Sequence, residues 1–256
     1  MRPQQCADQV QKTLPLIAFW VRSNLSFSNI AATCRRRPPL KRSTCFSRIQ
    51  NTLLSRKWFI IMPSDSKAKL MRTQIGQTVV ELVNGDIAEQ DTDAVVTAAH
   101  WKLHGGDGTD GAIHSKGGPK ILEECRRIGG CPIGGAVITG AGNLKARHVI
   151  HAVGPVYIGD DERDSDLLRS AYQSSLRVAA ENGLKSISFP SISTGAFGYP
   201  MRLAAPIALQ AILDFLKSEK HHLELVRMVL YSYDNPSALS LYAAALNRLL
   251  SAVPGL

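Results

Sequence analysis

The sequence is poor in the features that mark disulfide-stapled, membrane-spanning and repeat proteins. Its five cysteines are odd in number, and none stands in a CxxC or CxxCH spacing. Neither a disulfide framework nor a zinc site is therefore expected, and the thiols are expected to be reduced. No stretch approaches the roughly 20 apolar residues that a membrane-spanning helix requires. The sequence also contains no internal repeat of fixed period, which argues against a solenoid.

Acidic residues are almost absent from the first 64 positions. This segment contains eleven of the 30 Lys and Arg residues but only one acidic residue, Asp8. Residues 65–256 hold the other nineteen basic residues against twenty acidic ones, so they are nearly neutral. The net charge of +9 therefore belongs to the N-terminal segment. Specific nucleic-acid binding is not expected from the remainder of the chain.

The basic segment has two competing interpretations. Its Arg- and Ser-rich, acid-poor composition is typical of an organellar transit peptide. Alternatively, translation begins at Met62 and the preceding residues are translated upstream sequence. The segment lacks sustained helical or strand periodicity, so residues 1–70 are expected to be disordered and residues 71–256 to form one folded domain. The first interpretation predicts a mitochondrial or other organellar protein, and the second predicts a cytoplasmic one.

From residue 78 onward, strand patterns alternate with helix patterns. Such alternation predicts an α/β fold whose sheet is covered on both faces, with ligand sites at the carboxyl ends of the strands. Asp110 is expected to cap the first helix, which continues to about Gly118. Strands are expected at 78–83, 92–97, 136–139, 148–153, 186–190 and 225–231, and further helices at 120–128, 166–182, 201–217 and 236–250.

Two glycine loops fall at predicted strand ends. The first contains Gly105, Gly106 and Gly108 and leads into the helix behind Asp110. The second spans residues 191–200 and contains two glycines. A strand that feeds a glycine loop and then a helix presents backbone N–H groups to an anion, usually a phosphate.

Six motifs follow one another in residues 78–250. They are Val-Asn-Gly-Asp-Ile at 83–87, Val-Thr-Ala-Ala-His at 96–100, the glycine loop at 105–114, Pro-Ile-Gly-Gly-Ala-Val-Ile-Thr at 132–139, Val-Ile-His-Ala-Val-Gly-Pro-Val-Tyr at 149–157 and Ile-Ser-Thr-Gly-Ala-Phe-Gly-Tyr-Pro at 192–200. In this order they resemble the macrodomain family of ADP-ribose-binding modules. The resemblance is closest to the branch that deacetylates O-acetyl-ADP-ribose and removes mono-ADP-ribose from acidic side chains. It implies a three-layer α/β/α fold with a central mixed sheet.

The resemblance also implies roles for single residues. Asp86 is expected to accept a hydrogen bond from the adenine amine, although a plain turn or cap role is the alternative. The two loops are expected to hold the pyrophosphate, and Tyr231 or Tyr233 is expected to stack on the adenine. Asp110 is expected to orient the attacking water. ADP-ribose contacts are expected at Asp86, Ile87, Ala99, Gly105, Gly106, Gly108, Thr109, Ser193, Thr194, Gly195, Ala196, Phe197 and Tyr233, with Phe197 against the distal ribose.

Three residues depart from the family pattern. His100 and Thr97 stand where the family carries Asn, and Asp107 replaces a glycine. Two hypotheses follow: a hydrolase of ADP-ribosyl esters that uses Asp110 and His100, or a module that only binds ADP-ribose or mono-ADP-ribosylated proteins. Neither a cofactor nor a metal is expected, because His100 and His104 lie in a loop, not at the i, i+4 spacing of a helix. A monomer is expected.

Overall fold

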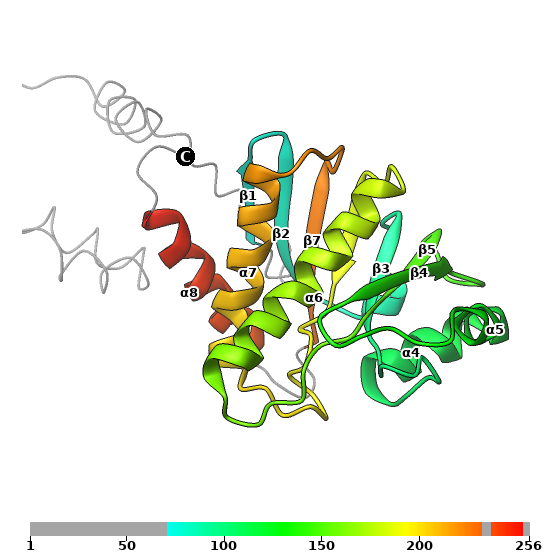
Figure 1. Cartoon of the computed structure of the whole chain (residues 1–256). Helices are drawn as coiled ribbons and strands as arrows, with labels where there is room; N and C mark the ends of the chain where they lie inside the picture. Colours follow the sequence, from blue (N-terminus) through cyan, green and yellow to red (C-terminus); the bar gives the residue numbers. More distant parts are fainter. Residues whose placement is uncertain (1–70, 232–236, 253–256) are drawn as a thin grey trace, which may run out of the picture. The chain divides into compact units, whose positions relative to one another are not determined.

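The computed structural model describes residues 71–231 and 237–252, so the basic leader at 1–70 lies outside the described residues and its predicted disorder stays a prediction (Figure 1). The described chain forms one seven-stranded mixed sheet in the order β1-β2-β7-β6-β3-β5-β4. The five central strands run parallel, and the edge strands β1 and β4 pair antiparallel with their neighbours. The strands are β1 (Met71–Ile75), β2 (Thr78–Asn84), β3 (Ala94–Ala98), β4 (Ala136–Gly140), β5 (His148–Ala152), β6 (Ser186–Phe189) and β7 (Leu225–Leu230).

Helices cover both faces of this sheet. The helices α6 (Asp161–Glu181), α7 (Met201–Ser218) and α8 (Ala238–Ser251) lie in front of it in Figure 1. The other face carries α4 (Gly108–Gly117), α5 (Pro119–Ile128) and the short 3-10 helix η2 (Ile87–Glu89). Side chains along a strand alternate between the faces, so Val96 packs into the α6–α8 core while its neighbour Val95 packs into the α4–α5 core. The predicted three-layer α/β/α fold is confirmed.

Three details differ from the sequence-based expectation. Strand β1 was not predicted, because it is a short polar edge strand whose exposure alternates and whose pairing with β2 supplies its hydrogen bonds. Helix α6 begins five residues before its predicted start, where the Asp160 side chain accepts a hydrogen bond from Arg163 N. Asp110 is not a helix cap: Asp107 is the N-cap of α4, and Asp110 lies inside the first turn.

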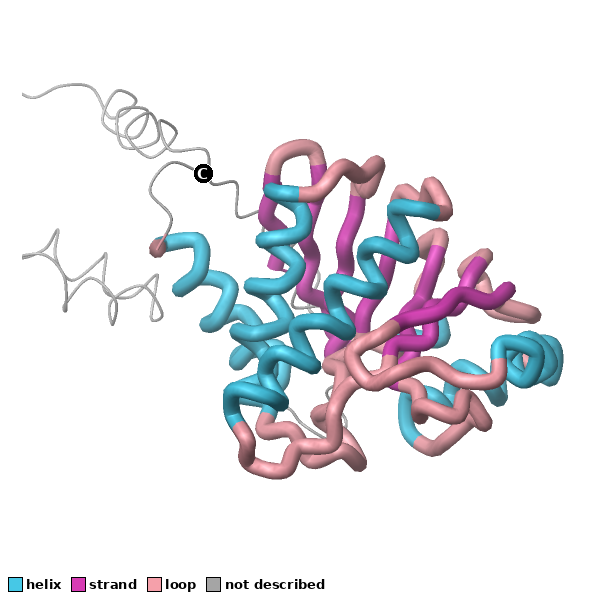
Figure 2. Tube along the Cα trace, viewed as in Figure 1, coloured by secondary structure: helices cyan, strands magenta, loops and turns pink. Residues whose placement is uncertain are grey.

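The order of the strands places the two glycine loops together. β3 and β6 are hydrogen-bonded neighbours and run parallel. The loop after β3 leads to α4 on one face of the sheet, whereas the loop after β6 leads to α7 on the other face. Because the chain leaves adjacent strands in opposite directions, an opening forms between the loops at the carboxyl ends of the strands, which is where such folds bind ligands. This edge is the lower one in Figure 2.

None of the helices in residues 71–231 and 237–252 is long and apolar enough to cross a membrane.

Candidate functional site

The loop after β3 presents unused hydrogen-bond donors at the start of α4. Gly105 and Gly108 adopt φ angles of 81° and 60°, a left-handed region that glycine enters without a steric penalty. Within the described residues, the amide N–H groups of Gly105, Gly106 and Gly108 donate to no acceptor. The first turn of a helix also carries a partial positive charge. Together, the free donors and the helix end form a site suited to an anion.

The loop after β6 supplies a second set of free donors. Two backbone hydrogen bonds brace it, from Tyr199 N to Ser193 O at 3.0 Å and from Gly198 N to Gly195 O at 2.9 Å. The loop tip is half-buried or exposed. A pyrophosphate needs several converging N–H groups without side-chain bulk, and this loop meets that need from the opposite side of the opening. In the described part of the chain, no acceptor is bound by the N–H groups of Thr194, Gly195, Ala196 and Phe197.

Ser193 is the strained residue of this second loop. It has a φ angle of 66°, which is unusual for a residue with a side chain, and it is only 4% exposed. Its hydroxyl has no hydrogen-bond partner among the described residues. A buried and unpaired hydroxyl costs free energy, so its retention beside free N–H groups favours a role toward a ligand.

Asp110 is a buried carboxylate at the mouth of the first loop. The Thr97 hydroxyl donates to its Oδ1 at 2.8 Å, and Nε2 of His114 lies 3.6 Å from the same oxygen. The other oxygen, Oδ2, faces the glycine loop, since a methyl group on Gly106 would lie 3.3 Å from it. Burial raises the pKa of Asp110 above its usual value, an effect opposed chiefly by the hydrogen bond from Thr97. One oxygen is thus fixed by Thr97, and the other faces the glycine loop.

His100 lies in the same loop with one ring nitrogen in use. Its Nδ1 accepts a hydrogen bond from Lys102 N at 3.2 Å, so in the neutral ring Nε2 carries the hydrogen. Its ring stacks on His104 with centroids 4.4 Å apart. Desolvation, with the nearby His104 and Lys102, lowers the pKa of His100 below its usual value. The imidazole is therefore neutral near pH 7 and offers a donor to a ligand.

Asp86 begins η2 at the carboxyl end of β2. Its Oδ1 caps this short helix by accepting from Ala88 N at 2.9 Å, and its Oδ2 pairs with Lys116 of α4 at 2.7 Å. Lys116 also contacts Glu89 at 2.8 Å, which places the cation between two carboxylates. These two carboxylates raise the pKa of Lys116 to about 12, and the Lys116 and Lys145 ammonium groups lower the pKa of Glu89 to about 2. The cap role and a ligand role are compatible, since each oxygen retains a lone pair.

Comparison with known proteins places this geometry in one family. The Macro domain family model matches residues 96–208. A macro domain-containing protein of Caldanaerobacter subterraneus subsp. tengcongensis is 52% identical over 157 residues, which cover 60% of this chain and 89% of that protein. The chain belongs to the macrodomain family. The resemblance seen in the sequence motifs is thereby confirmed.

Two further relatives are informative. A protein of Citrobacter koseri named O-acetyl-ADP-ribose deacetylase is 50% identical over 141 residues, which cover 54% of this macrodomain chain and 80% of that protein. The solved structure of an Oceanobacillus iheyensis macrodomain with ADP is 37% identical and superposes with a TM-score of 0.68, covering 73% of this chain and all of that one.

The predicted site residues fall into two groups in the structure. One group gathers at the carboxyl edge: Asp86 and Ile87 after β2, Ala99, His100, Gly105, Gly106, Gly108, Thr109 and Asp110 after β3, and Ser193, Thr194, Gly195, Ala196 and Phe197 after β6. A second group has one member, Tyr233, which lies outside the described residues. Asp107, which replaces a family glycine and was not a predicted contact, is exposed, so its charge is directed to solvent.

Sequence reasoning missed two contacts of the candidate site. Thr97 was noted only as a substitution, but its hydroxyl is the direct hydrogen-bond partner of Asp110. Lys116 was not singled out, because nothing in a Ser-Lys-Gly segment indicates a partner 30 residues earlier in the chain. Both contacts depend on how α4 packs against the sheet, which local sequence patterns do not report.

A buried cluster beneath the site contains potential metal ligands that differ from the loop histidines. Within the described residues, the ligand atoms of His114, Cys125 and His151 lie within 4.8 Å of one another. The Cys125 sulfur lies 3.8 and 3.6 Å from Nδ1 and Nε2 of His151. His151 Nε2 also bonds the Thr139 hydroxyl at 2.9 Å. His151 is thus a buried side chain whose polar atoms have partners within the protein.

Burial keeps two members of this cluster neutral. It lowers the pKa of His151 to about 3 and raises the pKa of the Cys125 thiol to about 11. A metal ion would have to displace the proton of this buried thiol, which the raised pKa makes more costly.

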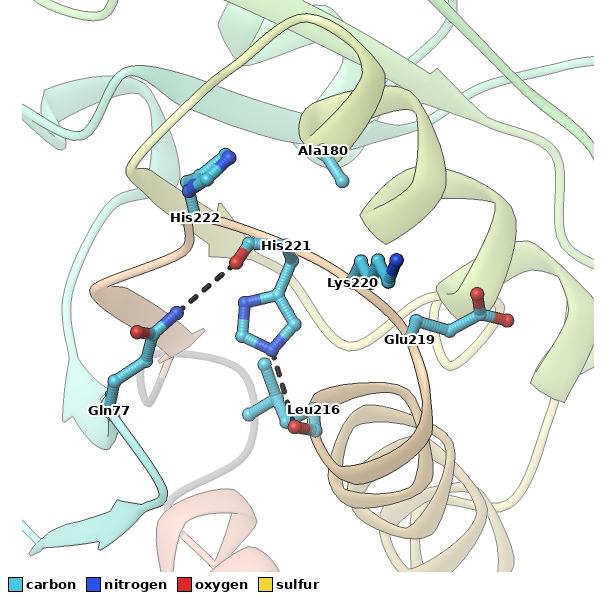
Figure 3. A pocket seen from close by; sticks show the side chains of 7 residues that line it. All are labelled: Gln77, Ala180, Leu216, Glu219, Lys220, His221 and His222. Carbon is cyan, nitrogen blue, oxygen red and sulfur yellow. Dashed lines mark hydrogen bonds between the residues drawn. The ribbon is translucent and has the colours of Figure 1, made fainter.

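A separate pocket lies at the opposite end of the sheet. It has a volume of about 590 Å³ and sits near the amino ends of β2 and β7 (Figure 3). Both ring nitrogens of His221 are occupied, by Leu216 O and by Leu223 N, each at 3.2 Å. Glu219 lies 3.7 Å from Arg177. The polar groups at this pocket are thus largely satisfied, and the free donors and buried carboxylate favour the carboxyl edge as the functional site.

Proposed function

We propose that this macrodomain binds ADP-ribose and hydrolyses ADP-ribosyl esters, either O-acetyl-ADP-ribose or mono-ADP-ribosylated Asp and Glu side chains. The observation that carries this proposal is Asp110, a buried carboxylate beside Gly106 in the first of two loops of free N–H donors at the carboxyl edge of the sheet. The donors suit the pyrophosphate, and the carboxylate suits a base beside the ester. The name of the Citrobacter koseri relative supports the same reaction.

The geometry divides the work between the two carboxylate oxygens of Asp110. Oδ1 is held by Thr97, and Oδ2 faces Gly106 of the first glycine loop. A water bound at Oδ2 transfers a proton to it as the water oxygen attacks the ester. The acyl–ribose bond then breaks, and the leaving oxygen takes a proton, which gives free ADP-ribose and the carboxylic acid. The raised proton affinity of the buried carboxylate assists the first transfer.

His100 acts on the ribose in this proposal. Because Nδ1 accepts from Lys102 N, the neutral ring presents Nε2–H, which donates to a ribose oxygen. A base role would require the other tautomer and the loss of the Lys102 contact. Asp86 receives the adenine amine at the far end of the site, and the pairing of its Oδ2 with Lys116 fixes the direction of that carboxylate.

A second function, that of a non-catalytic reader of ADP-ribose, is favoured by one specific observation. A ring that only donates replaces the family's Asn, which both donates and accepts. The reader retains both sets of loop donors and lacks turnover.

Incubation with a peptide that carries one mono-ADP-ribosylated glutamate, and separately with O-acetyl-ADP-ribose, distinguishes the two functions. Release of free ADP-ribose by the wild-type protein, with no release by Asp110→Ala, is the expected result. Tight binding of ADP-ribose without release from either substrate would show that the domain is a non-catalytic reader and not a hydrolase.

The change His100→Asn tests the ribose-holding role. Asn restores the family's donor and acceptor, so the variant is expected to retain or exceed the wild-type kcat/KM in the same assay. A large loss of kcat would instead show that the imidazole takes part in proton transfer, and in that case the acidic limb of the pH profile would also move.

A further inference from the structure

An apolar and basic surface lies beside the His100 loop. It joins the loop after β3 to the end of α5 and the segment that follows α5. We refer to it as the distal surface, because it adjoins the part of the site where the ester is expected. Its members are exposed, and their side chains have no role in the proposed chemistry: Trp101, Lys102, Arg126, Arg127, Ile128 and Ile133.

The apolar part of the distal surface consists of three large side chains. Trp101, Ile128 and Ile133 are 50%, 40% and 43% exposed, and they make up half of the six strongly exposed large apolar side chains in the described residues. A hydrogen bond from Cys131 N to Trp101 O, at 2.9 Å, joins the two segments that carry them. The three side chains therefore stand on two segments that are hydrogen-bonded to each other, and exposed apolar side chains mark an interaction site where they lie together.

The charged part consists of three cations with no counter-ion. The Lys102 ammonium lies 5.0 Å from the centre of the Trp101 ring, and Arg126 and Arg127 end α5. None of the three forms an ion pair with any residue in the described ranges 71–231 and 237–252. Lys116 and Lys145 differ, because both are neutralised by carboxylates. The unpaired cations favour an acidic partner.

The location of this surface identifies the partner. The Trp101 ring lies 5.5 Å from the His100 ring, which is expected to hold the ribose that carries the ester. In an ADP-ribosylated protein, the chain that flanks the modified residue must leave the site at this point. We propose that the distal surface docks an acidic segment of the protein that carries the ADP-ribosyl ester, and this inference rests on the proposed function.

An acidic protein segment fits this surface better than nucleic acid does. Residues 65–256 carry nineteen basic and twenty acidic residues, so the domain has no general attraction for a polyanion. The surface offers three cations mixed with three large apolar side chains. That combination matches a peptide with acidic and apolar residues, since aromatic and Arg side chains are the usual anchors of protein interfaces.

Two peptides that carry the same single ADP-ribosylated glutamate test this inference with the full-length protein. One peptide has Asp and Glu on both sides of the modified residue, and the other has Asn and Gln. The double change Arg126→Glu/Arg127→Glu is expected to raise KM for the acidic peptide about tenfold, with kcat and the KM for the neutral peptide unchanged. Trp101→Ala is expected to raise KM for both peptides. The matched control Lys217→Glu/Lys220→Glu reverses two other unpaired cations in α7 and the loop after it, and should leave all values unchanged.

Binding measurements with free ADP-ribose and with the modified peptides distinguish a failure of the proposed function from a failure of this inference. Free ADP-ribose should bind the wild-type protein and the Arg126→Glu/Arg127→Glu variant equally, which also shows that the variant is folded. Failure of the wild-type protein to bind ADP-ribose would overturn the proposed function itself. If the wild-type protein binds ADP-ribose but has equal affinity for the two modified peptides, the inference about the distal surface is overturned and the proposed function is not. Tighter binding of a single-stranded oligonucleotide than of the acidic peptide, lost in the arginine variant, would assign the surface to nucleic acid and likewise overturn the inference.

Discussion

Replacement of Asp110 with asparagine is expected to lower kcat for ADP-ribosyl ester hydrolysis by about 10²–10⁴-fold while ADP-ribose affinity changes little. Asparagine keeps the size of the side chain and an oxygen that accepts from the Thr97 hydroxyl, so the loop geometry is preserved. It lacks the second carboxylate oxygen that receives the proton from water. Steady-state hydrolysis and calorimetric titration with ADP-ribose measure the two quantities separately.

The matched control is Asp107→Asn, the same change in the same loop. Asp107 is exposed and its side chain makes no capping hydrogen bond, so this variant should keep the wild-type kcat. A wild-type kcat in Asp110→Asn would show that Asp110 does not act as the base.

The same carboxylate links pH to both activity and stability. Burial raises the pKa of Asp110 above 3.8, and a base works only when ionised, so activity should fall as pH decreases through this raised pKa. Asp110 binds its proton more tightly in the folded protein than in the unfolded chain. Its contribution to the free energy of unfolding is therefore largest below the pKa that Asp110 has in the unfolded chain, and it is lost as pH rises through the higher pKa of the folded protein. At pH 7 the ionised group therefore destabilises the fold. Asp110→Asn should unfold at a higher temperature than the wild type at pH 7, by a margin that shrinks toward pH 4.

The strands and the two glycine loops could be predicted because their signals are local. A buried parallel strand such as β3 requires a β-branched apolar run, and a tight turn toward an anion requires glycine. Strand β1 has no such run, since its stability comes from pairing with β2 at the sheet edge. Its polar, alternating sequence is also typical of a loop. The sequence therefore located the core of the sheet better than its edge.

The details of the site could not be predicted for a related reason. The segment Gly-Asp-Gly-Thr-Asp contains two aspartates that suit an N-cap, and local rules do not choose between Asp107 and Asp110. The choice depends on Thr97, a buried strand residue whose hydroxyl holds Asp110 inside the first turn of α4. The pairing of Asp86 with Lys116 likewise requires α4 to lie against η2. Such contacts arise when the layers pack, and they decide which oxygen of each carboxylate remains for a ligand.

Gly154 packs against Ser193 and Ile192 of the second loop. The change Gly154→Ala is expected to weaken ADP-ribose binding about tenfold to a hundredfold, because small displacements of positioning groups have such effects. A methyl group at this position would collide with Oγ of Ser193 and lie 2.6 Å from Cγ2 of Ile192. Ile192 is fully buried, so its side chain has no free space to occupy. The backbone of the loop must then move, and with it the N–H groups that face the opening. Overpacking of this kind also costs roughly 1–3 kcal/mol of stability, which thermal unfolding measures.

Two further variants separate this collision from the general effect of replacing glycine. In Gly85→Ala the new methyl group meets only ordinary contacts, at 3.6 Å from Gln90 and 3.8 Å from Val229, so stability and affinity should stay near wild type. Ser193→Gly removes the buried hydroxyl and suits the φ angle of 66°. Combined with Gly154→Ala, it should recover part of the lost affinity, because the two residues are in contact and their effects are not additive. Full additivity of the two changes would show that Gly154 does not act through the loop, since the collision with Ser193 is the only link between them that the combined variant removes.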